Sequence, residues 1–330
     1  MARVTVFGAG AMGTAFAMHA VRRGLDTALW ANPYDELALE HLRSEGRHPL
    51  LPEHLPAGIR VFGPDALDEA AVGCEIAVMA ANSHGARSLA RMVVGAISGV
   101  RLVVSVAKGL EPETGLRISA VYGEELAAEV VAIGGPCLAA ELAEALPTAA
   151  AWASGDGGAT AREAGAPFES DDYQILYTDD VVGVELCSTM KNVAAIGLGF
   201  LDGLGKPIQE DFKNAKAALF AEATRELSEL VSALGGRAET ALGLAGVGDQ
   251  LVTSLGGRNR LYGELVGAGN PPDKTLEEME GRGMTVEGVD STRDVHRLAA
   301  EAGVDLPYHL AVYRVLFEGA DPRRVLEVLR

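Results

Sequence analysis

The sequence is poor in basic residues, in aromatic residues and in cysteine for a chain of 330 residues. Its 28 lysines and arginines face 46 aspartates and glutamates, which leaves a formal net charge of −18. Nucleic acids and anionic membranes are bound through basic surfaces, so this balance argues against both as partners. An anionic small molecule would need a local basic pocket to overcome the global field.

Three cysteines, Cys74, Cys137 and Cys187, lie far apart in apolar segments. Their spacing forms neither a metal-binding pattern nor a disulfide framework, so we expect a reducing, cytoplasmic location and no bound metal. The opening segment MARVTVFGAG leads directly into a predicted strand, and we expect no signal peptide. No uncharged stretch reaches the roughly 18–20 residues of a membrane helix, so we expect no membrane insertion.

The chain does contain 48% hydrophobic residues and 40 glycines, while aromatic residues make up only 5%. This composition favours an α/β protein with a large core and many tight turns over a β-sandwich. At about 150 residues per domain, the length predicts two domains.

The segment ARVTVFGAGAMGTAFAMHAVRRG, which starts at Ala2, carries the first functional motif. Residues 4–7 predict a short buried strand, Gly8, Gly10 and Gly13 fit the pattern G-x-G-x-x-G, and an apolar helix and a second strand follow. In this order Gly8 permits a tight turn, Gly10 lets the backbone approach a pyrophosphate, and Gly13 lets helix and strand pack closely. The pattern predicts a dinucleotide site; the alternative is a glycine-rich turn in another βαβ unit.

Further strands are predicted at α/β spacing, and ligands of open parallel sheets lie outside the carboxyl ends of such strands. Lys108 follows one of them and is the strongest polar candidate, the alternative being a solvated loop lysine. The second strand ends close to Asn32, with neither the acid typical of NAD sites nor the arginine typical of NADP sites, so the cofactor is NAD or NADP. These further strands are expected in the ranges 75–81, 101–110, 129–142, 150–154 and 173–180.

After Asp180 the pattern becomes helical. Apolar residues recur at three-to-four spacing across 213–235, which predicts an amphipathic helix. The segment VELCSTMKNVAAIGLGF, residues 184–200, is almost wholly apolar but has Lys191 at its centre. Burying an unpaired ammonium is costly, so Lys191 either extends to a surface or has a function.

Six ordered blocks resemble the NAD(P)-dependent glycerol-3-phosphate dehydrogenase family of bacteria and archaea. They cover nearly the whole chain, which makes the resemblance far more specific than one glycine motif. The blocks are GAGAMGTA from Gly8, AKGLE around Lys108, GGPCLAAELA from Gly134, ELCSTMKNVAAIGLG around Lys191, GLAGVGDQLVTSLGGRNRLYG from Gly243, and TVEGV from Thr285.

The resemblance implies a fold and a reaction. The fold is α/β, with a Rossmann-type doubly wound sheet over residues 1–182 and an all-α substrate and catalytic domain over residues 183–330. The active site is expected in the cleft between these domains. The reaction interconverts dihydroxyacetone phosphate and sn-glycerol 3-phosphate, working mostly in the reducing direction for phospholipid precursor supply. A homodimer is expected.

The resemblance also assigns roles to residues. Lys191 matches the lysine that donates a proton to the carbonyl oxygen, and Asp249 matches an aspartate that orients or balances it. Lys108 matches a second active-site lysine, and Thr253 lies one helical turn after Asp249 on the same face. Arg258 and Asn259 match a phosphate-binding pair. The expected cofactor-binding residues are Gly8, Gly10, Ala11, Met12, Gly13, Asn32, Lys108, Ala140, Arg258 and Glu287.

These roles have structural alternatives. Asp249 would instead be a helix cap, and Arg258 would be an ordinary surface arginine. The chain also departs from the family pattern at Glu222, at Ala223 and in the turn 82–84, which leaves another polyol or sugar phosphate open as the substrate. A 3-hydroxy acid dehydrogenase of similar fold is a second reading. A dinucleotide-sensing protein without activity is a third, although it would not need to keep a proton donor.

Overall fold

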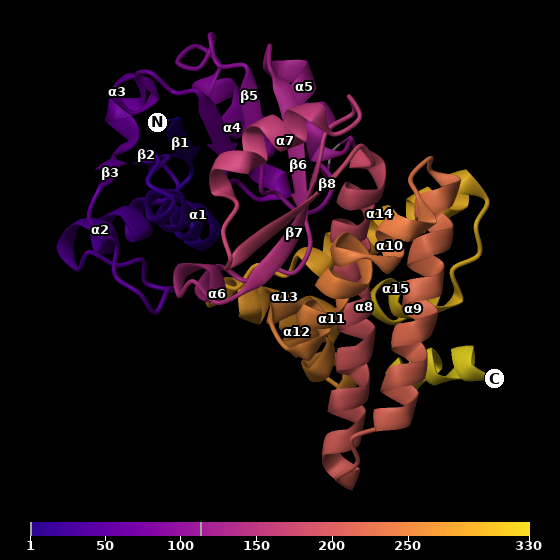
Figure 1. Ribbon diagram of the computed structural model, residues 1–330. Helices are drawn as coiled ribbons and strands as arrows, with labels where there is room; N and C mark the ends of the chain where they lie inside the picture. The colour runs from indigo at the N-terminus through magenta and orange to yellow at the C-terminus, as the bar shows by residue number, and fades with distance from the viewer. Residues whose placement is uncertain (1, 113) are drawn as a thin grey trace. The chain divides into compact units, whose positions relative to one another are not determined.

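The computed structural model describes residues 2–112 and 114–330 (Figure 1). By its internal contacts the chain divides into two compact units, Met1–Val181 and Val182–Arg330. We call them the N-terminal unit and the helical unit. The N-terminal unit is a sheet with helices on both faces, and the helical unit is built from helices.

One sheet of eight strands organises the described part of the N-terminal unit, in the order β3-β2-β1-β4-β5-β6-β7-β8. Neighbouring strands pair in parallel except β6 and β7, which are antiparallel, so β7 and β8 run against the other six. The strands are β1 Arg3–Phe7, β2 Asp26–Trp30, β3 Ile59–Phe62, β4 Ile76–Met79, β5 Leu102–Ser105, β6 Glu129–Gly134, β7 Thr148–Ala153 and β8 Tyr173–Thr178.

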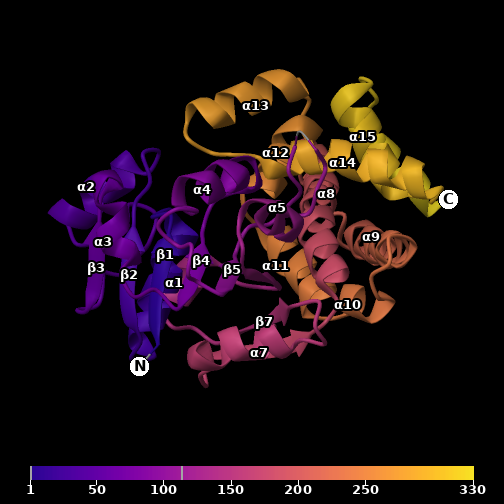
Figure 2. The same cartoon turned by 90° about the horizontal axis from the view of Figure 1, so that it is seen from above.

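Each face of the sheet carries its own apolar core. Phe16, Trp152 and Phe168 lie in the core under α1, α6 and α7. Trp30 and Tyr122 lie in the core under α3, α4 and α5, and Figure 2 shows α4 and α5 on the side of the sheet opposite α7. The central strands are therefore buried on both faces, which explains their continuous apolar sequences. The helices are α1 Ala11–Arg22, α2 Glu36–Ser44, α3 Leu67–Ala71, α4 Ala86–Val93, α5 Ile118–Glu125, α6 Ala139–Ala143 and α7 Ala159–Gly165.

The helical unit is arranged around α8, whose residues are almost all buried. Gly199 and Gly203 of α8 face the backbone of α12, where Gly263 and Gly267 face α8 in turn, so the two helices approach closely. The helices are α8 Val181–Gly205, α9 Lys213–Ala233, α10 Ala238–Leu242, α11 Asp249–Leu255, α12 Arg258–Gly267, α13 Pro272–Gly281, α14 Glu287–Ala302 and α15 Pro307–Phe317.

Among the described residues one helical stretch, Val181–Ile208, has the length and composition of a membrane span. However, 89% of its most apolar window is buried inside the protein, as in a core helix. Glycines of this helix pack closely against α12 and, at Gly197, against Tyr308 and Val312 of α15.

The predicted fold class, a Rossmann-type sheet followed by an all-helical part, is confirmed. One strand was not predicted: β3, whose four residues are only half-buried at the sheet edge. The last segment, Pro322–Leu329, forms 3₁₀ turns, and its N-terminal proline follows the capping side chain of Asp321.

Candidate active site

The glycine turn joins β1 to α1. Gly8 has a φ of +113°, and a Cβ there would lie 2.5 Å from the carbonyl oxygen of Ala80, so only glycine fits. A Cβ at Gly13 would contact the Gly8 carbonyl and the Ala80 side chain, whereas a Cβ at Gly10 would meet no atom within 4 Å. The turn is thus tight at its first and third glycines and open at its second. Ala11 and Met12, in the first turn of α1, are half-buried beside it.

A carboxylate fixes the loop after β2. Asp35 accepts hydrogen bonds from the backbone N–H groups of Ala9 (2.8 Å) and Asn32 (3.0 Å), and so connects this loop to the glycine turn. Burial raises the pKa of Asp35 above its usual value. Asn32 was predicted from the sequence as a cofactor contact, whereas Asp35 was not. Its position three residues after Asn32, directly before α2, is the signal for such a turn.

Lys108 follows β5 and is partly buried. Its Nζ donates a hydrogen bond of 3.0 Å to the carbonyl oxygen of Gly135, which follows the parallel neighbour β6. Lys108 therefore lies at the carboxyl ends of the parallel strands, where ligands of such sheets bind. Ala140 lies exposed in α6, in the segment that follows Gly135.

The turn that carries Lys108 is anchored by an ion pair. Arg87 of α4 makes two hydrogen bonds to Glu111, at 2.7 and 2.8 Å, in the bidentate geometry typical of arginine and carboxylate. These bonds hold the pKa of Glu111 below its usual value. This pair was not predicted from the sequence, because the two residues lie 24 positions apart with no local pattern to connect them.

Lys191 and Asp249 form a buried ion pair in the helical unit. The Lys191 Nζ lies 2.6 Å from Asp249 Oδ1, and the two residues are 6% and 1% exposed. Lys191 comes from the middle of α8, and Asp249 is the first residue of α11 after the π-helical turn Leu244–Gly248. The lysine therefore does not extend to a surface, which was the alternative that its sequence left open.

Arg258 and Thr253, two of the predicted substrate-binding residues, differ in exposure. Arg258 is exposed in the first turn of α12, directly after Gly257. Thr253 is half-buried in α11, one turn after Asp249. The next arginine, Arg260, instead bonds to Asp202 at 2.7 Å and to the Ser254 carbonyl.

Both polar atoms of the Asn259 side chain are hydrogen-bonded to other residues of the helical unit. Its Nδ2 donates to Asn192 Oδ1 of α8, and its Oδ1 accepts from the Gly288 backbone N–H, both at 2.9 Å. Glu287, the first residue of α14, is half-buried beside Gly288. Asn192 was not among the predicted site residues, although it directly follows Lys191.

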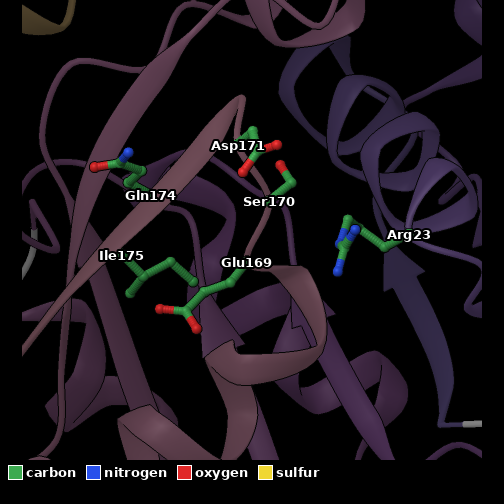
Figure 3. Close-up of a pocket in the computed structure, with 6 residues that line it drawn as sticks. All are labelled: Arg23, Glu169, Ser170, Asp171, Gln174 and Ile175. Atoms are coloured by element: carbon green, nitrogen blue, oxygen red, sulfur yellow. The ribbon is translucent and has the colours of Figure 1, made fainter.

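Figure 3 shows a surface pocket of the N-terminal unit. Arg23 follows the last residue of α1, at the opposite end of the helix from the glycine turn. A 12-residue helix is about 18 Å long, so this pocket is separate from the turn. It is lined by Arg23, Glu169, Ser170, Asp171, Gln174 and Ile175, none of which is a predicted site residue.

Comparisons with known proteins point to the same family along nearly the whole chain. A family model for the NAD-dependent glycerol-3-phosphate dehydrogenase N-terminus matches residues 3–159, and the model for the C-terminus matches residues 180–327. A glycerol-3-phosphate dehydrogenase (NAD(P)+) of Clostridium botulinum is 35% identical, covering 100% of this chain and 97% of its own. An NADP(+)-dependent glycerol-3-phosphate dehydrogenase of Archaeoglobus fulgidus is 31% identical, covering 98% and 97%.

Comparison with solved structures points to the same family. The crystal structure of glycerol-3-phosphate dehydrogenase from Coxiella burnetii is 29% identical, has a TM-score of 0.86, and covers 99% of this chain and 98% of its own. A ketopantoate reductase from Ralstonia eutropha, 16% identical with a TM-score of 0.60, shares the fold alone.

These matches place the protein among the NAD(P)-dependent oxidoreductases in which a nucleotide-binding sheet precedes an all-helical part. Within that class, the chain belongs to the NAD-dependent glycerol-3-phosphate dehydrogenase family. The family resemblance predicted from the sequence is thereby confirmed.

Proposed function

We propose that this protein catalyses the NAD(P)H-dependent reduction of dihydroxyacetone phosphate to sn-glycerol 3-phosphate, and the reverse oxidation. The observation that carries this proposal is the buried Lys191–Asp249 pair at 2.6 Å. A buried ammonium held by a carboxylate suits proton transfer to a carbonyl oxygen better than it suits packing, because burying a charge is costly.

The glycine turn fits a dinucleotide. Open space around Gly10 leaves room for a pyrophosphate, and the N-terminus of α1 offers backbone N–H groups to it. The nicotinamide of the bound cofactor supplies the hydride in the reducing direction. We assign the cofactor contacts to Gly8, Gly10, Ala11, Met12, Gly13, Asn32, Lys108, Ala140, Arg258 and Glu287, with NAD and NADP both open.

Lys191 and Asp249 are proposed to carry out the proton transfer. We propose that the Lys191 ammonium donates its proton to the substrate carbonyl oxygen, which becomes the new hydroxyl, while the carbonyl carbon receives the hydride. Asp249 holds the Lys191 side chain in place. In the reverse direction Lys191 accepts the hydroxyl proton, so the same pair serves both directions.

The substrate phosphate requires a cationic partner in an acidic protein. We propose Arg258 for this role, because it is exposed at the start of α12, where backbone N–H groups also favour anions. Thr253 and Lys108 are proposed as further substrate contacts. Asn259 is proposed as the fourth substrate contact, next to Arg258, and its side chain is also hydrogen-bonded to Asn192 and Gly288.

We further propose a cytoplasmic homodimer that supplies sn-glycerol 3-phosphate for phospholipid synthesis and inserts into no membrane. The absence of a disulfide framework supports a reducing compartment. The net charge of −18 supports a small-molecule partner over nucleic acid or an anionic membrane surface.

A substrate panel tests the proposal. Purified protein is given NADH or NADPH with dihydroxyacetone phosphate, unphosphorylated dihydroxyacetone, other ketose phosphates, or a 3-oxo acid. We expect the highest kcat/KM with dihydroxyacetone phosphate. At saturating cofactor, Arg258→Ala should raise KM for that substrate by roughly 10-fold or more, as expected for loss of one charge-assisted contact, and should change the kinetics with dihydroxyacetone little. Preference for the 3-oxo acid, or cofactor binding without any turnover, would overturn the proposal.

A further inference from the structure

Arg87 lies where a helix disfavours a positive charge. It is the second residue of α4, and the N-terminal end of a helix carries a partial positive charge of its own. Three glutamates outside the helix offset this cost, each within 2.8 Å of the guanidinium: Glu111 after β5, and Glu124 and Glu125 at the end of α5. Arg87 therefore joins α4 to α5, which lies beside it (Figure 2), and to the turn after β5.

Glu111 is the most buried of the three glutamates, and its carboxylate also organises its own turn. Its side chain is 8% exposed, against 20% for Arg87. Besides the two bonds from Arg87, its Oε2 accepts a bond of 2.5 Å from the Thr114 hydroxyl. Its backbone N–H donates to the Leu116 carbonyl at 2.9 Å, and its carbonyl accepts from the Gly115 N–H at 2.7 Å. Without Arg87 this carboxylate would lose its cation while nearly buried, which is costly, so the turn would shift to expose it.

Lys108 lies three residues before Glu111 in the same turn. Between them, Gly109 has a φ of +121° and packs against Ser83, whose Oγ would lie 3.2 Å from a Cβ at position 109. Ser83 belongs to the short turn directly before α4. Two contacts, Gly109 with Ser83 and Glu111 with Arg87, thus hold the turn of residues 108–111 against the start of α4.

We propose that Arg87 is a positioning residue for Lys108. Through Glu111 it fixes the turn of residues 108–111 and so holds the Lys108 ammonium at the carboxyl ends of β5 and β6, where Lys108 contacts the substrate. This inference rests on the proposed function for the role of Lys108. Arg87 acts without touching substrate or cofactor, because a displacement of about 1 Å in a group that contacts the substrate is enough to lower the rate strongly.

Arg87→Met gives the kinetic test, because it keeps the length of the side chain and removes its bonds to Glu111. We expect kcat/KM with dihydroxyacetone phosphate to fall by roughly 10-fold or more. Arg87→Lys keeps the charge but not the paired geometry, so its kcat/KM should lie between those of wild type and Arg87→Met. Arg91→Met is the matched control. Arg91 lies one turn further along α4 and pairs with Glu125, and its loss should leave kcat/KM within about 2-fold of wild type.

A kinetic cycle with Lys108 separates positioning from a merely structural role. In the Lys108→Ala background, Arg87→Met should change kcat/KM by less than about 2-fold, because the residue that it positions is gone. An equal loss with and without Lys108 would overturn the proposal. A lower denaturation midpoint of Arg87→Met with kcat/KM near that of wild type would also overturn it, since Arg87 would then only stabilise the fold.

A second arm needs no substrate. The rate at which an N-hydroxysuccinimide ester acylates Lys108 is measured by peptide mass spectrometry in each variant. In wild type the Lys108 Nζ is held by the Gly135 carbonyl at 3.0 Å. We expect acylation to be roughly 5-fold faster in Arg87→Met, as for loss of one hydrogen bond, and unchanged in Arg91→Met.

The two arms fail independently. An unchanged acylation rate in folded Arg87→Met would overturn the proposal, because Lys108 would then keep its place without Arg87. If wild-type protein fails to reduce dihydroxyacetone phosphate, the proposed function fails, while the acylation rates still decide whether Arg87 holds Lys108.

Discussion

Lys191 lies in an environment that disfavours a charged side chain, the middle of a buried apolar helix. Asp249 offsets the cost of burying its charge with an ion pair at 2.6 Å. The sequence predicted the lysine's importance from its isolation among apolar residues. It could not predict the ion-pair geometry from local patterns, because Asp249 lies 58 positions away.

Removing one member of this pair is expected to cost more stability than replacing both. Asp249→Asn leaves the Lys191 ammonium buried beside a neutral amide, and we expect a loss of about 3–5 kcal/mol in the free energy of unfolding. Lys191→Met combined with Asp249→Leu should recover most of that loss, because no buried charge remains. Urea denaturation of the whole protein, followed by circular dichroism, measures these variants together with the single substitutions Lys191→Met and Asp249→Leu. A double variant that loses the sum of what these two single variants lose would show that the pair is not coupled.

At the scale of single elements, two glycines of the turn between β1 and α1 serve different purposes. Gly13 is needed for packing, whereas Gly10 leaves space for a cofactor. Gly13 is required by packing, since a Cβ there would lie 2.9 Å from the Ala80 Cβ and would contact the Gly8 carbonyl. Gly10 has ordinary backbone angles, φ −65° and ψ 174°, and open space around it. The protein alone does not need a glycine at position 10.

Two matched substitutions test this separation. Gly10→Ala should leave the denaturation midpoint within experimental error of wild type and weaken NADH binding by 10-fold or more, because the methyl group occupies the approach to the pyrophosphate. Gly13→Ala should destabilise the N-terminal unit by about 1–3 kcal/mol through overpacking. NADH fluorescence titration and thermal denaturation give the two readouts. Normal cofactor binding by Gly10→Ala would place the pyrophosphate elsewhere.

The strong elements of the sheet were predictable because their signals are local. β1, β4 and β5 are short apolar runs, and the glycine turn follows β1 at fixed spacing. The weak edge strand β3 and the antiparallel β6–β7 pairing were not predicted, since their register depends on tertiary contacts. The bonds of Asp35 to Ala9 and of Asn192 to Asn259 were not predicted for the same reason: in each, the partner is distant in sequence.

For the whole molecule, stability in mild acid is expected to depend on buried histidines. Burial lowers the pKa of His19 to about 4, where it packs against Phe168 and its Nε2 donates to the Phe168 carbonyl at 2.7 Å. The unfolded chain takes up this proton near pH 6.5, and the folded chain does so only near pH 4. The contribution of neutral His19 to the free energy of unfolding is therefore complete above pH 6.5. It is lost progressively as pH falls toward 4, and the total loss is on the order of 3 kcal/mol.

His19→Gln tests this pH dependence, because it keeps a donor and removes the titration. We expect a flatter dependence of stability on pH between 6.5 and 4 in the variant than in wild type. Both tryptophans of the chain, Trp30 and Trp152, lie in the N-terminal unit, so their fluorescence follows the unfolding of that unit. Burial also lowers the pKa of His48 to about 4, so part of the slope will remain. An unchanged slope would contradict the role of His19.

The measurement that tests the central claim most directly follows the NADH absorbance of wild-type and Lys191→Ala protein with saturating dihydroxyacetone phosphate, repeated with NADPH. The account predicts oxidation by wild type with at least one cofactor. It also predicts a fall in kcat of about 10²–10⁴-fold in Lys191→Ala, with cofactor affinity unchanged because the glycine turn is intact. Absence of oxidation by wild type with bound cofactor, or a loss below about tenfold in the variant, would contradict Lys191 as the proton donor.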